Sequence, residues 1–377
     1  MTRSGTFLPG DPRNYYQRHK MRARVVIGSS FGDEGKGLIT DYLCHQGAGM
    51  VVRFNGGAQA GHTVVRPDGK RHVFHHFGSG SFEGIPTYLS QFFILNPICF
   101  YREVEELRKL GIHPTVYAHP ECLLTTFADM IINQEIENKR GDGRHGSVGI
   151  GINETIERSG VPELKITMAD LWNGSKSVER KIGEICGRYA RFRTGKPIEK
   201  PEEMIVAFLK NCETFAGDIH PLGIAQCEDP VFEGAQGLLL DQDNKEFFPH
   251  LTRSNTGMKN VRVLCAQAGI TNIDAYYVSR TYLTRHGAGP LPGEDLKMSF
   301  QDDTNMDHPY QGRLRFSGLD YNALRSRCTK DFGCGSYKLV LTHMDQLPLA
   351  ERADLYSYGP TYEDVKSTPS RTRLSDE

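Results

Sequence analysis

Apolar runs that end on glycine recur along the early part of the chain and predict strands and helices in turn. Residues 22–28, RARVVIG, form a short β-branched run ending on glycine, as a buried strand does. Residues 36–47, KGLITDYLCHQG, carry apolar side chains at helical spacing and stop at a glycine. A second β-branched run, GMVVRFNGG, follows at residues 49–57. The order of strand, loop, helix and strand is the opening of an α/β unit.

The same alternation continues over most of the chain. Further helices are predicted at residues 100–112, 121–140 and 257–270, and further strands at residues 229–237, 272–284 and 337–345. Between residues 191 and 221 the chain becomes charged and rich in proline and glycine, which predicts an excursion from the sheet. Because strands alternate with helices, we predict an α/β fold with a mainly parallel central sheet covered by helices.

The composition is that of a soluble globular chain, and its charge argues against nucleic acid and membranes as partners. The 377 residues carry a formal net charge of -1, so no broad cationic field points to nucleic acid or a membrane surface. The nine cysteines include no C-x-x-C pair, which indicates a reducing compartment. Residues 1–22 are interpreted as a flexible N-terminal arm without a signal sequence, ahead of a single domain at residues 23–377. With no apolar run long enough to span a bilayer, the protein is expected to be cytoplasmic.

The loop after the first strand, GSSFGDEGKGL, has the composition of a phosphate-binding loop without a standard spacing. Ser30 stands where a P-loop needs its first glycine, and the dinucleotide-binding pattern G-x-G-x-x-G is absent. Its glycines still let backbone N–H groups approach a phosphate, and Lys36 adds a positive charge at a helix N-terminus. Asp33 and Glu34 would repel that phosphate unless one of them binds Mg²⁺ or removes a proton. A tight turn between strand and helix is the alternative.

Two later segments offer polar side chains at strand ends. His62 lies among glycines in RFNGGAQAGHTVV, which favours an imidazole that faces a ligand. Gln236 ends the strand in FEGAQG, where an amide can donate to and accept from the edge of a base. His72, His75 and His76 have no carboxylate at a metal-binding spacing, so a polar strand edge is preferred to a metal site there.

Two segments near the C-terminus carry charges suited to ligands. Arg313 and Arg315 alternate on an extended segment, which suits bidentate capture of a carboxylate, with a solvated charge pair as the alternative. Asp345 follows the buried strand YKLVLT, and its carboxylate can accept two hydrogen bonds from the N1 and N2 edge of guanine.

Taken together and in this order, the motifs resemble those of the adenylosuccinate synthetase family. The chain contains GDEGKG at 32–37, AGHT at 60–63, EGAQG at 233–237, TRHGAGP at 284–290, GRLR at 312–315 and THMD at 342–345. The tail YSYGPTYEDV also resembles the family's C-terminal segment. The resemblance covers nearly all of the chain after the arm. It implies the family's P-loop-NTPase-like fold and the activity of a carbon–nitrogen ligase.

The chemistry implied by this resemblance has two steps. A nucleoside triphosphate phosphorylates the 6-oxo group of a purine mononucleotide, and the amine of L-aspartate then displaces the phosphate. By resemblance, Asp33 would take the N1 proton, and His62 would stabilise or protonate the transferring phosphoryl group. Lys36 and Gln236 complete the implied catalytic set, and Asp33 with the backbone at Gly61 would hold Mg²⁺.

The resemblance also implies three sets of binding residues. The triphosphate would be bound by Gly32, Glu34, Gly35, Lys36, Gly37, Gly61, Thr63, His343 and Asp345. The purine nucleotide would be bound by Asp33, Gln59, Ser147, Arg158, Gln236, Thr252 and His286. Arg158 would reach the nucleotide of the neighbouring subunit in a homodimer, and Arg313 with Arg315 would bind the carboxylates of aspartate.

Several positions depart from the common family pattern and resemble its viral branch, the 2-aminoadenylosuccinate synthetases. That branch joins aspartate to dGMP on the route to 2-aminoadenine DNA. The likeness is carried by Phe31, Leu38, NKEFFPHLTRS and GPTYEDV. The better-known viral members have a small residue in place of Asp33, so the sequence resembles an intermediate form.

These departures make dGMP the expected acceptor, with GMP and IMP as open choices. ATP and GTP both stay open as donors, because Asp345 favours guanine whereas His343 replaces a lysine of the family pattern. An ordinary adenylosuccinate synthetase using IMP and GTP is the first alternative. A non-catalytic nucleotide-binding protein is the remote one, because the implied catalytic residues are all retained.

Overall fold

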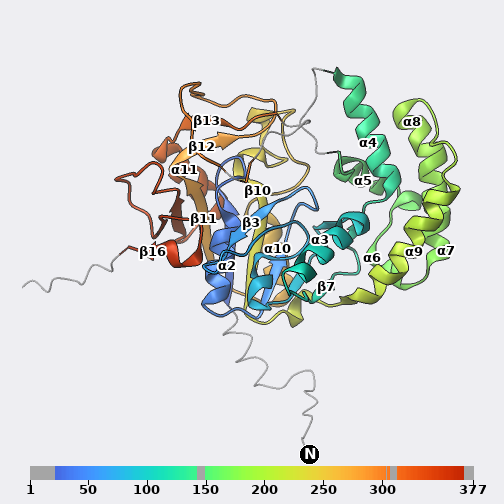
Figure 1. Cartoon of the computed structure of the whole chain (residues 1–377), viewed down its shortest axis with the longest axis horizontal. Coiled ribbons are helices and arrows are strands. Elements are labelled where there is room, and N and C mark those ends of the chain that lie inside the picture. The colour runs from blue at the N-terminus through green and yellow to red at the C-terminus, as the bar shows by residue number, and fades with distance from the viewer. Residues whose placement is uncertain (1–21, 142–148, 303, 306–311, 369–377) are drawn as a thin grey trace, which may run out of the picture.

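The computed structural model describes residues 22–141, 149–302, 304–305 and 312–368 (Figure 1). Most of the predicted N-terminal arm, and Ser147, lie outside these residues. Arg22 is the first residue of strand β1 (Arg22–Gly28). The division into an arm at residues 1–22 and a single domain at residues 23–377 stays a prediction.

A sheet of ten strands forms the centre of the molecule, in the order β16-β15-β14-β11-β1-β10-β2-β5-β7-β9. Its middle strands are β14 (Lys338–Thr342), β11 (Asn272–Arg280), β1, β10 (Pro230–Gly237) and β2 (Met50–Arg53). The flanking strands are β15 (Leu355–Ser357), β16 (Val365–Ser367), β5 (Thr87–Leu89), β7 (Val116–Ala118) and β9 (Ile219–Pro221). Strand β16 pairs antiparallel with β15, and the other neighbours in this sheet are parallel. The predicted mainly parallel sheet is confirmed.

Helices bury both faces of this sheet, as the near-continuous apolar runs of its strands require. In β1, Val26 packs with Leu38 of helix α2 (Lys36–His45) in one apolar cluster. On the other face, Val25 and Ile27 belong to a second cluster with helices α10 (Met258–Ala268) and α11 (Tyr321–Phe332). Helix α2 starts directly after the loop that follows β1, so its N-terminus lies at the carboxyl edge of the sheet.

A group of helices extends the sheet at one end, beyond β7 (Figure 1). It contains α3 (Pro97–Lys109), α4 (Phe127–Arg140), α5 (Ile152–Ser159), α6 (Met168–Trp172), α7 (Ser175–Glu184), α8 (Ala190–Thr194) and α9 (Glu202–Asp218). The excursion from the sheet therefore begins well before residue 191. The predicted helix at 121–140 starts only at Phe127, because Thr126 and Asp129 form a capping box. Within its first part, Leu123–Leu124 form strand β8.

Two short antiparallel ribbons lie outside the main sheet, as does a third pair in which β6 (Ile94–Leu95) runs parallel to β8. Strands β12 (Tyr282–Arg285) and β13 (Arg315–Gly318) pair antiparallel, as do β3 (His62–Val65) and β4 (Arg71–Phe74). The strand predicted at 272–284 is therefore two strands, since the chain leaves the main sheet after β11. Within the described part of the chain, no helix combines the length and apolar character that a membrane crossing needs.

Candidate active site

Five loops that carry predicted site residues meet at the carboxyl ends of the central strands. Asp33 follows β1, Gln59 follows β2, and Gln236 lies at the end of β10. His286 follows β12, the continuation of β11, and His343 follows β14. In open parallel sheets, ligands bind in the crevice at this edge. The order of the strands thus brings together motifs that are far apart in the sequence.

The loop between β1 and α2 is held together by two of its own charged side chains. The buried Glu34 carboxylate accepts hydrogen bonds from the backbone N–H groups of Ser30, at 2.9 Å, and Gly32, at 2.8 Å. Lys36 Nζ donates to Glu34 Oε2 at 2.9 Å and to the Gly32 carbonyl. Because the Glu34 side chain is used within the loop, the triphosphate contact predicted for Glu34 would have to come from its backbone.

Asp33 lies in a different environment from Glu34. No described residue donates a hydrogen bond to the Asp33 carboxylate, whereas its backbone carbonyl accepts one from Arg280 Nε. Burial raises the pKa of Asp33, against the opposing charges of His286 and Arg280. A half-buried carboxylate with a raised pKa suits proton acceptance, and its oxygens suit a hard cation.

The donor set for a metal ion is incomplete in the protein alone. Among the described residues, no group of three or more His, Cys, Asp or Glu side chains could hold a metal ion. Mg²⁺ commonly binds through one or two carboxylates together with substrate phosphates. Asp33 fits this mode as the protein carboxylate, with backbone and substrate oxygens as the remaining ligands.

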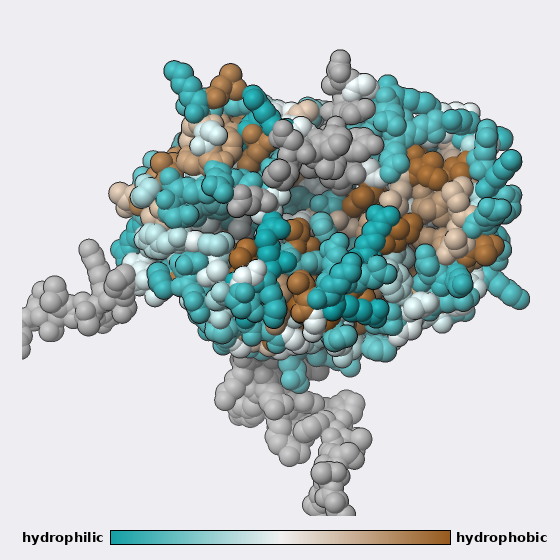
Figure 2. Space-filling view, in the orientation of Figure 1, coloured by the Kyte–Doolittle hydropathy of each residue, from teal (hydrophilic) through white to brown (hydrophobic). Residues whose placement is uncertain are grey.

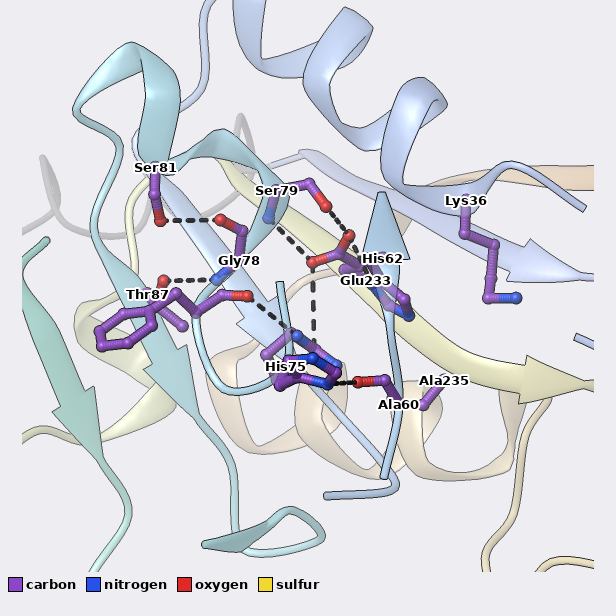
Figure 3. A network of polar contacts seen from close by, with 12 residues as sticks. Lys36, Ala60, His62, His75, Gly78, Ser79, Ser81, Thr87, Glu233 and Ala235 are labelled. Carbon is purple, nitrogen blue, oxygen red and sulfur yellow. Dashed lines mark hydrogen bonds and ion pairs between the residues drawn. The ribbon is translucent and has the colours of Figure 1, made fainter. Parts of the chain in front are cut away.

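His62 begins β3 and lies against Glu233 of β10 (Figure 3). Nδ1 of His62 is 2.7 Å from Glu233 Oε1, although off the ideal N–H direction, and its Nε2 has no partner among the described residues. Ser79 donates to the same carboxylate from its backbone N–H, at 3.1 Å, and from its hydroxyl. Burial lowers the pKa of His62 to about 4, opposed by Glu233 and reinforced by Arg53 and Lys36. The imidazole is therefore neutral near pH 7.

Two amide side chains meet at Gly56, between the loops that follow β2 and β10. A Cβ atom added to Gly56 would lie 3.5 Å from Gln236 Oε1 and 3.8 Å from Gln59 Nε2. Gln236 has a φ of 56°, a left-handed conformation that is uncommon for a residue with a side chain. The Oε1 atoms of both glutamines are buried, with no partner among the described residues. Because buried polar atoms rarely lack partners, this pair suits the N–H groups of a bound base.

Cationic side chains gather where β12 pairs with β13. Arg285 lies opposite Arg315, and burial together with the charge of Arg315 lowers the pKa of Arg285 to about 10. Like charges at opposing positions are unfavourable without an anion nearby. Arg315 donates to two carbonyl oxygens of residues 287–289, at 2.8 and 2.7 Å, and pairs with Glu294 at 2.8 Å. Arg315 therefore stabilises the glycine loop here, whereas Arg313 is exposed and is the more accessible of the two residues predicted to bind aspartate.

The end of β14 packs against the loop that follows β1. Thr342 Oγ1 donates to the Glu34 carbonyl at 2.8 Å. His343 follows with a φ of 62°, and burial lowers its pKa to about 3. Asp345 is exposed just beyond. Contact of His343 and Asp345 with the base of the triphosphate stays a prediction.

Three glycines predicted to bind the triphosphate allow tight approaches. Gly35, with a φ of 92°, precedes the first residue of α2. A Cβ atom on Gly37 would come within 2.7 Å of the Thr63 carbonyl oxygen, so Gly37 lets β3 pack against α2. A Cβ atom on Gly61 would lie 3.1 Å from Val73. Their contacts with phosphate or metal stay predictions.

Thr252 and Thr63, two further predicted binding residues, differ in how their polar groups are already bonded within the protein. Thr252 is half-buried on the loop that follows β10, and its N–H donates to the Leu240 carbonyl. Thr63 Oγ1 is buried and has no partner among the described residues. Binding of the nucleotide by Thr252 stays a prediction.

The structure corrects the role predicted for Arg158. Its guanidinium is buried, with Nε 2.7 Å from Asp129 Oδ1 and Nη1 2.7 Å from the Leu164 carbonyl oxygen. Nη2 donates to Asp129 Oδ2 at 3.0 Å and to the Leu124 carbonyl. Because these bonds hold the guanidinium inside its own protomer, Arg158 is not placed to reach a nucleotide in a neighbouring subunit. The homodimer stays a prediction without this residue to support it.

The histidines of RHVFHHFGSG also differ from the prediction of a polar strand edge. His76 is fully buried, with Nδ1 3.1 Å from Glu103 Oε2, and His72 Nε2 lies 3.8 Å from Glu103 Oε1. The Glu103 carboxylate also accepts from the backbone N–H groups of His75 and His76, at 2.7 and 2.8 Å. These residues therefore connect the segment after β4 to helix α3.

Sequence reasoning missed several charged residues of this site. Glu233 and Arg285 stand inside motifs that were recognised, EGAQG and TRHGAGP, but were given no role. Arg53 and Arg280 lie within predicted strands, where a charge in an apolar run is itself a signal of a partner. Arg280 pairs with Asp302, Nη2 to Oδ2, at 2.7 Å. Their partners come from other strands and loops, so the sequence alone could not assign them.

The fold and site define an α/β protein with a polar site at the carboxyl edge of a parallel sheet, where open α/β sheets bind their ligands. The chain belongs to the adenylosuccinate synthetase family, whose profile matches residues 25–372. The adenylosuccinate synthetase of Alkalilimnicola ehrlichii is 34% identical over 286 residues, 72% of this chain and 64% of that protein. That of Psychrobacter cryohalolentis is 32% identical over 343 residues, 86% of this chain and 77% of that protein. The match thus spans less than two-thirds of the length of the first of these relatives.

Two solved structures share the fold at low sequence identity. The fully ligated adenylosuccinate synthetase from Plasmodium falciparum has a TM-score of 0.66 and 19% identity, covering 92% of this chain and 86% of that chain. The succinoaminodeoxyadenylate synthetase of cyanophage S-2L, bound to dGMP and to dATP as an energy donor, has a TM-score of 0.61 and 17% identity. That comparison covers 94% of this chain and 97% of the phage chain.

Proposed function

We propose that this protein is a ligase that joins L-aspartate to C6 of a purine mononucleotide through a 6-phosphoryl intermediate. The observation that carries the proposal is a set of buried polar atoms without described partners at one edge of the sheet. They are Nε2 of His62 and Oε1 of Gln59 and Gln236. Unsatisfied buried groups are costly, and a bound base and phosphoryl group would satisfy them.

The proposed roles follow from the environment of each side chain. Asp33, with a raised pKa and no described hydrogen bond to its carboxylate, accepts the N1 proton of the purine. His62 is neutral in the free protein, takes up a proton as the negative charge of the triphosphate enters the site, and then donates from Nε2 to the phosphoryl group. Gln236 and Gln59 orient the base. Lys36 binds the triphosphate, either after breaking its ion pair with Glu34 or while keeping it. Mg²⁺, held by Asp33 and the Gly61 backbone, would neutralise phosphate charge when bound.

The acceptor favoured in this proposal is dGMP, which makes the product a precursor of 2-aminoadenine nucleotides. In structural comparison the chain covers 97% of the S-2L phage enzyme, whose structure contains dGMP, and 86% of the Plasmodium falciparum adenylosuccinate synthetase. Retention of Asp33 and the 31–34% identity to bacterial adenylosuccinate synthetases favour the second candidate, IMP with GTP. The donor is proposed to be ATP or GTP.

A substrate matrix tests the proposal. The purified chain is incubated with Mg²⁺ and L-aspartate, crossing IMP, GMP and dGMP with ATP and GTP, while phosphate release and product mass are followed. The expected result is a succinyl-amino product from dGMP that requires aspartate. A His62→Asn variant purified in the same way controls for contaminating phosphatase. Turnover of IMP alone would replace dGMP by the second candidate, and silence in every combination would refute the ligase.

A further inference from the structure

We propose that Glu233 is a positioning residue that orients the His62 ring with Nδ1 toward its carboxylate and Nε2 toward the reacting phosphoryl group. The assignment of the phosphoryl group rests on the proposed function. The assignment of the ring orientation rests on the contacts alone. Figure 3 shows the His62 ring between the Glu233 carboxylate and the side on which Lys36 lies.

The Glu233 carboxylate is itself fixed by several groups. It is fully buried on β10, and Oε2 accepts the Ser79 backbone N–H at 3.1 Å. The Ser79 hydroxyl donates to Oε1, and Arg53 Nε lies 3.9 Å from Oε2. The Ser79 contacts come from the 3-10 turn Ser79–Glu83, and Arg53 comes from β2. Held from both directions, the carboxylate has little freedom to turn away from His62.

The chemistry of the pair selects one tautomer of the histidine. An ionised carboxylate only accepts hydrogen bonds, so its position 2.7 Å from Nδ1 favours a proton on that nitrogen, although the contact lies off the ideal N–H direction. In the neutral imidazole, Nε2 is then the unprotonated nitrogen. Nε2 is buried and has no hydrogen-bond partner among the described residues, so a ligand bound beside it would satisfy it. A carboxylate that sets a histidine tautomer in this way also supports the positive charge that a protonated ring would carry.

The backbone of His62 is held as firmly as its ring. A Cβ atom added to Gly37 would lie 3.1 Å from the carbonyl carbon of His62 and 3.2 Å from its Cβ. Helix α2 therefore packs directly on this part of β3. With the backbone set by Gly37 and the ring set by Glu233, the position of Nε2 is largely determined before any ligand binds.

The main competing explanation is that Glu233 only neutralises the buried Arg53. The distances argue against it, because the Arg53 contact is 3.9 Å whereas the His62 contact is 2.7 Å. Arg53 Nη1 donates to the Phe77 carbonyl at 3.0 Å, whereas its Nε and Nη2 have no hydrogen bond among the described residues, so Arg53 does not fix the Glu233 carboxylate by a direct hydrogen bond. A purely structural Glu233 would be needed for stability but not for the tautomer of His62.

The test compares Glu233→Gln with Glu103→Gln. Glu103 is a matched control because it is also a buried glutamate in contact with histidines, outside the proposed site. In Glu233→Gln, kcat is expected to fall roughly 10- to 100-fold with little change in KM, as for other groups that orient a catalytic histidine. In Glu103→Gln, kcat of the folded enzyme should stay near the wild-type value. A wild-type kcat in folded Glu233→Gln would overturn the proposal.

Two readouts separate positioning from structure. Nitrogen-15 NMR of histidine-labelled full-length protein, with His62 assigned from His62→Asn, should show Nδ1 protonated in wild type and a changed tautomer mixture in Glu233→Gln. In a His62→Asn background, Glu233→Gln should cost little further activity, because the two residues act as one unit. An unchanged tautomer, or a full additional loss in that background, would refute the assignment.

If Glu233→Gln does not fold, Ser79→Ala provides a second variant that tests the same proposal. It removes the hydroxyl that holds the carboxylate but keeps the Glu233 charge, and it should change the tautomer mixture in the same direction. Wild-type tautomer and kcat in Ser79→Ala would then refute the proposal. The NMR readout needs no turnover, so failure of the proposed ligase activity and failure of the Glu233 role remain distinguishable.

Discussion

Replacing Gly37 by alanine tests the close packing that places His62. The new Cβ would lie 2.7 Å from the Thr63 carbonyl oxygen and 3.1 Å from the His62 carbonyl carbon, both of them backbone atoms. Relief requires β3 to move away from α2 by several tenths of an ångström. Overpacking of this kind costs about 1–3 kcal/mol of unfolding free energy, offset by up to about 1 kcal/mol from the better helix propensity of alanine. A shift of His62 on the scale of 1 Å can reduce kcat by as much as ~10²-fold.

The matched control for Gly37→Ala is Gly183→Ala in α7. No atom lies within 4 Å of a Cβ added to Gly183, so alanine there should raise stability by about 0.5–1 kcal/mol and leave kcat unchanged. Urea unfolding and steady-state rates at saturating substrates measure both effects. If Gly37→Ala behaves like Gly183→Ala in both assays, the inference that β3 depends on the missing side chain is refuted.

Three further predictions concern charged groups. Asp33→Asn should lower kcat at least ~10²-fold in the phosphate-release assay, because it removes the proposed proton acceptor, and a near-normal rate would remove that role. Arg158→Met should cost about 3–5 kcal/mol in urea unfolding because it leaves the buried Asp129 carboxylate without its counter-ion and with only the Thr126 capping bonds, and Arg158→Met with Asp129→Asn should recover part of the loss. A single-variant loss below about 1 kcal/mol would contradict this. Burial raises the pKa of Asp41 from 3.8 to about 6, although the charge of Arg66 opposes the shift. Between these two pH values the folded protein keeps a proton on Asp41 that the unfolded chain has lost. The stabilisation that this proton gives is therefore complete below pH 3.8 and is lost as the pH rises through 6. Between pH 4 and pH 7 the unfolding free energy of Asp41→Asn should therefore rise by up to about 3 kcal/mol relative to that of the wild type. If the unfolding free energies of the two proteins change in parallel with pH, the effect is excluded.

Local pattern was sufficient to predict much of the fold. The β-branched runs with glycine stops correctly predicted β1, β2 and the parallel sheet, because both faces of each strand are buried, and the helical spacing of apolar residues predicted α2. The errors occurred where tertiary contacts override local pattern. The strand at 272–284 divides because its second half pairs with β13, a partner with no local signal. The helix at 121–140 starts late because Thr126 caps it.

The sequence by itself determined which residue types stand at the ends of the central strands, and with them the family. Glycine, carboxylate and amide motifs are local features, since each is set by a few neighbouring positions. Only the tertiary structure decided which partner each side chain takes. Glu34 binds its own loop, Arg158 is held inside its protomer by Asp129, and His62 meets Glu233 from a distant strand. The physical reason is that such pairings depend on strand order and on the direction each side chain leaves its strand or helix, which no local spacing specifies.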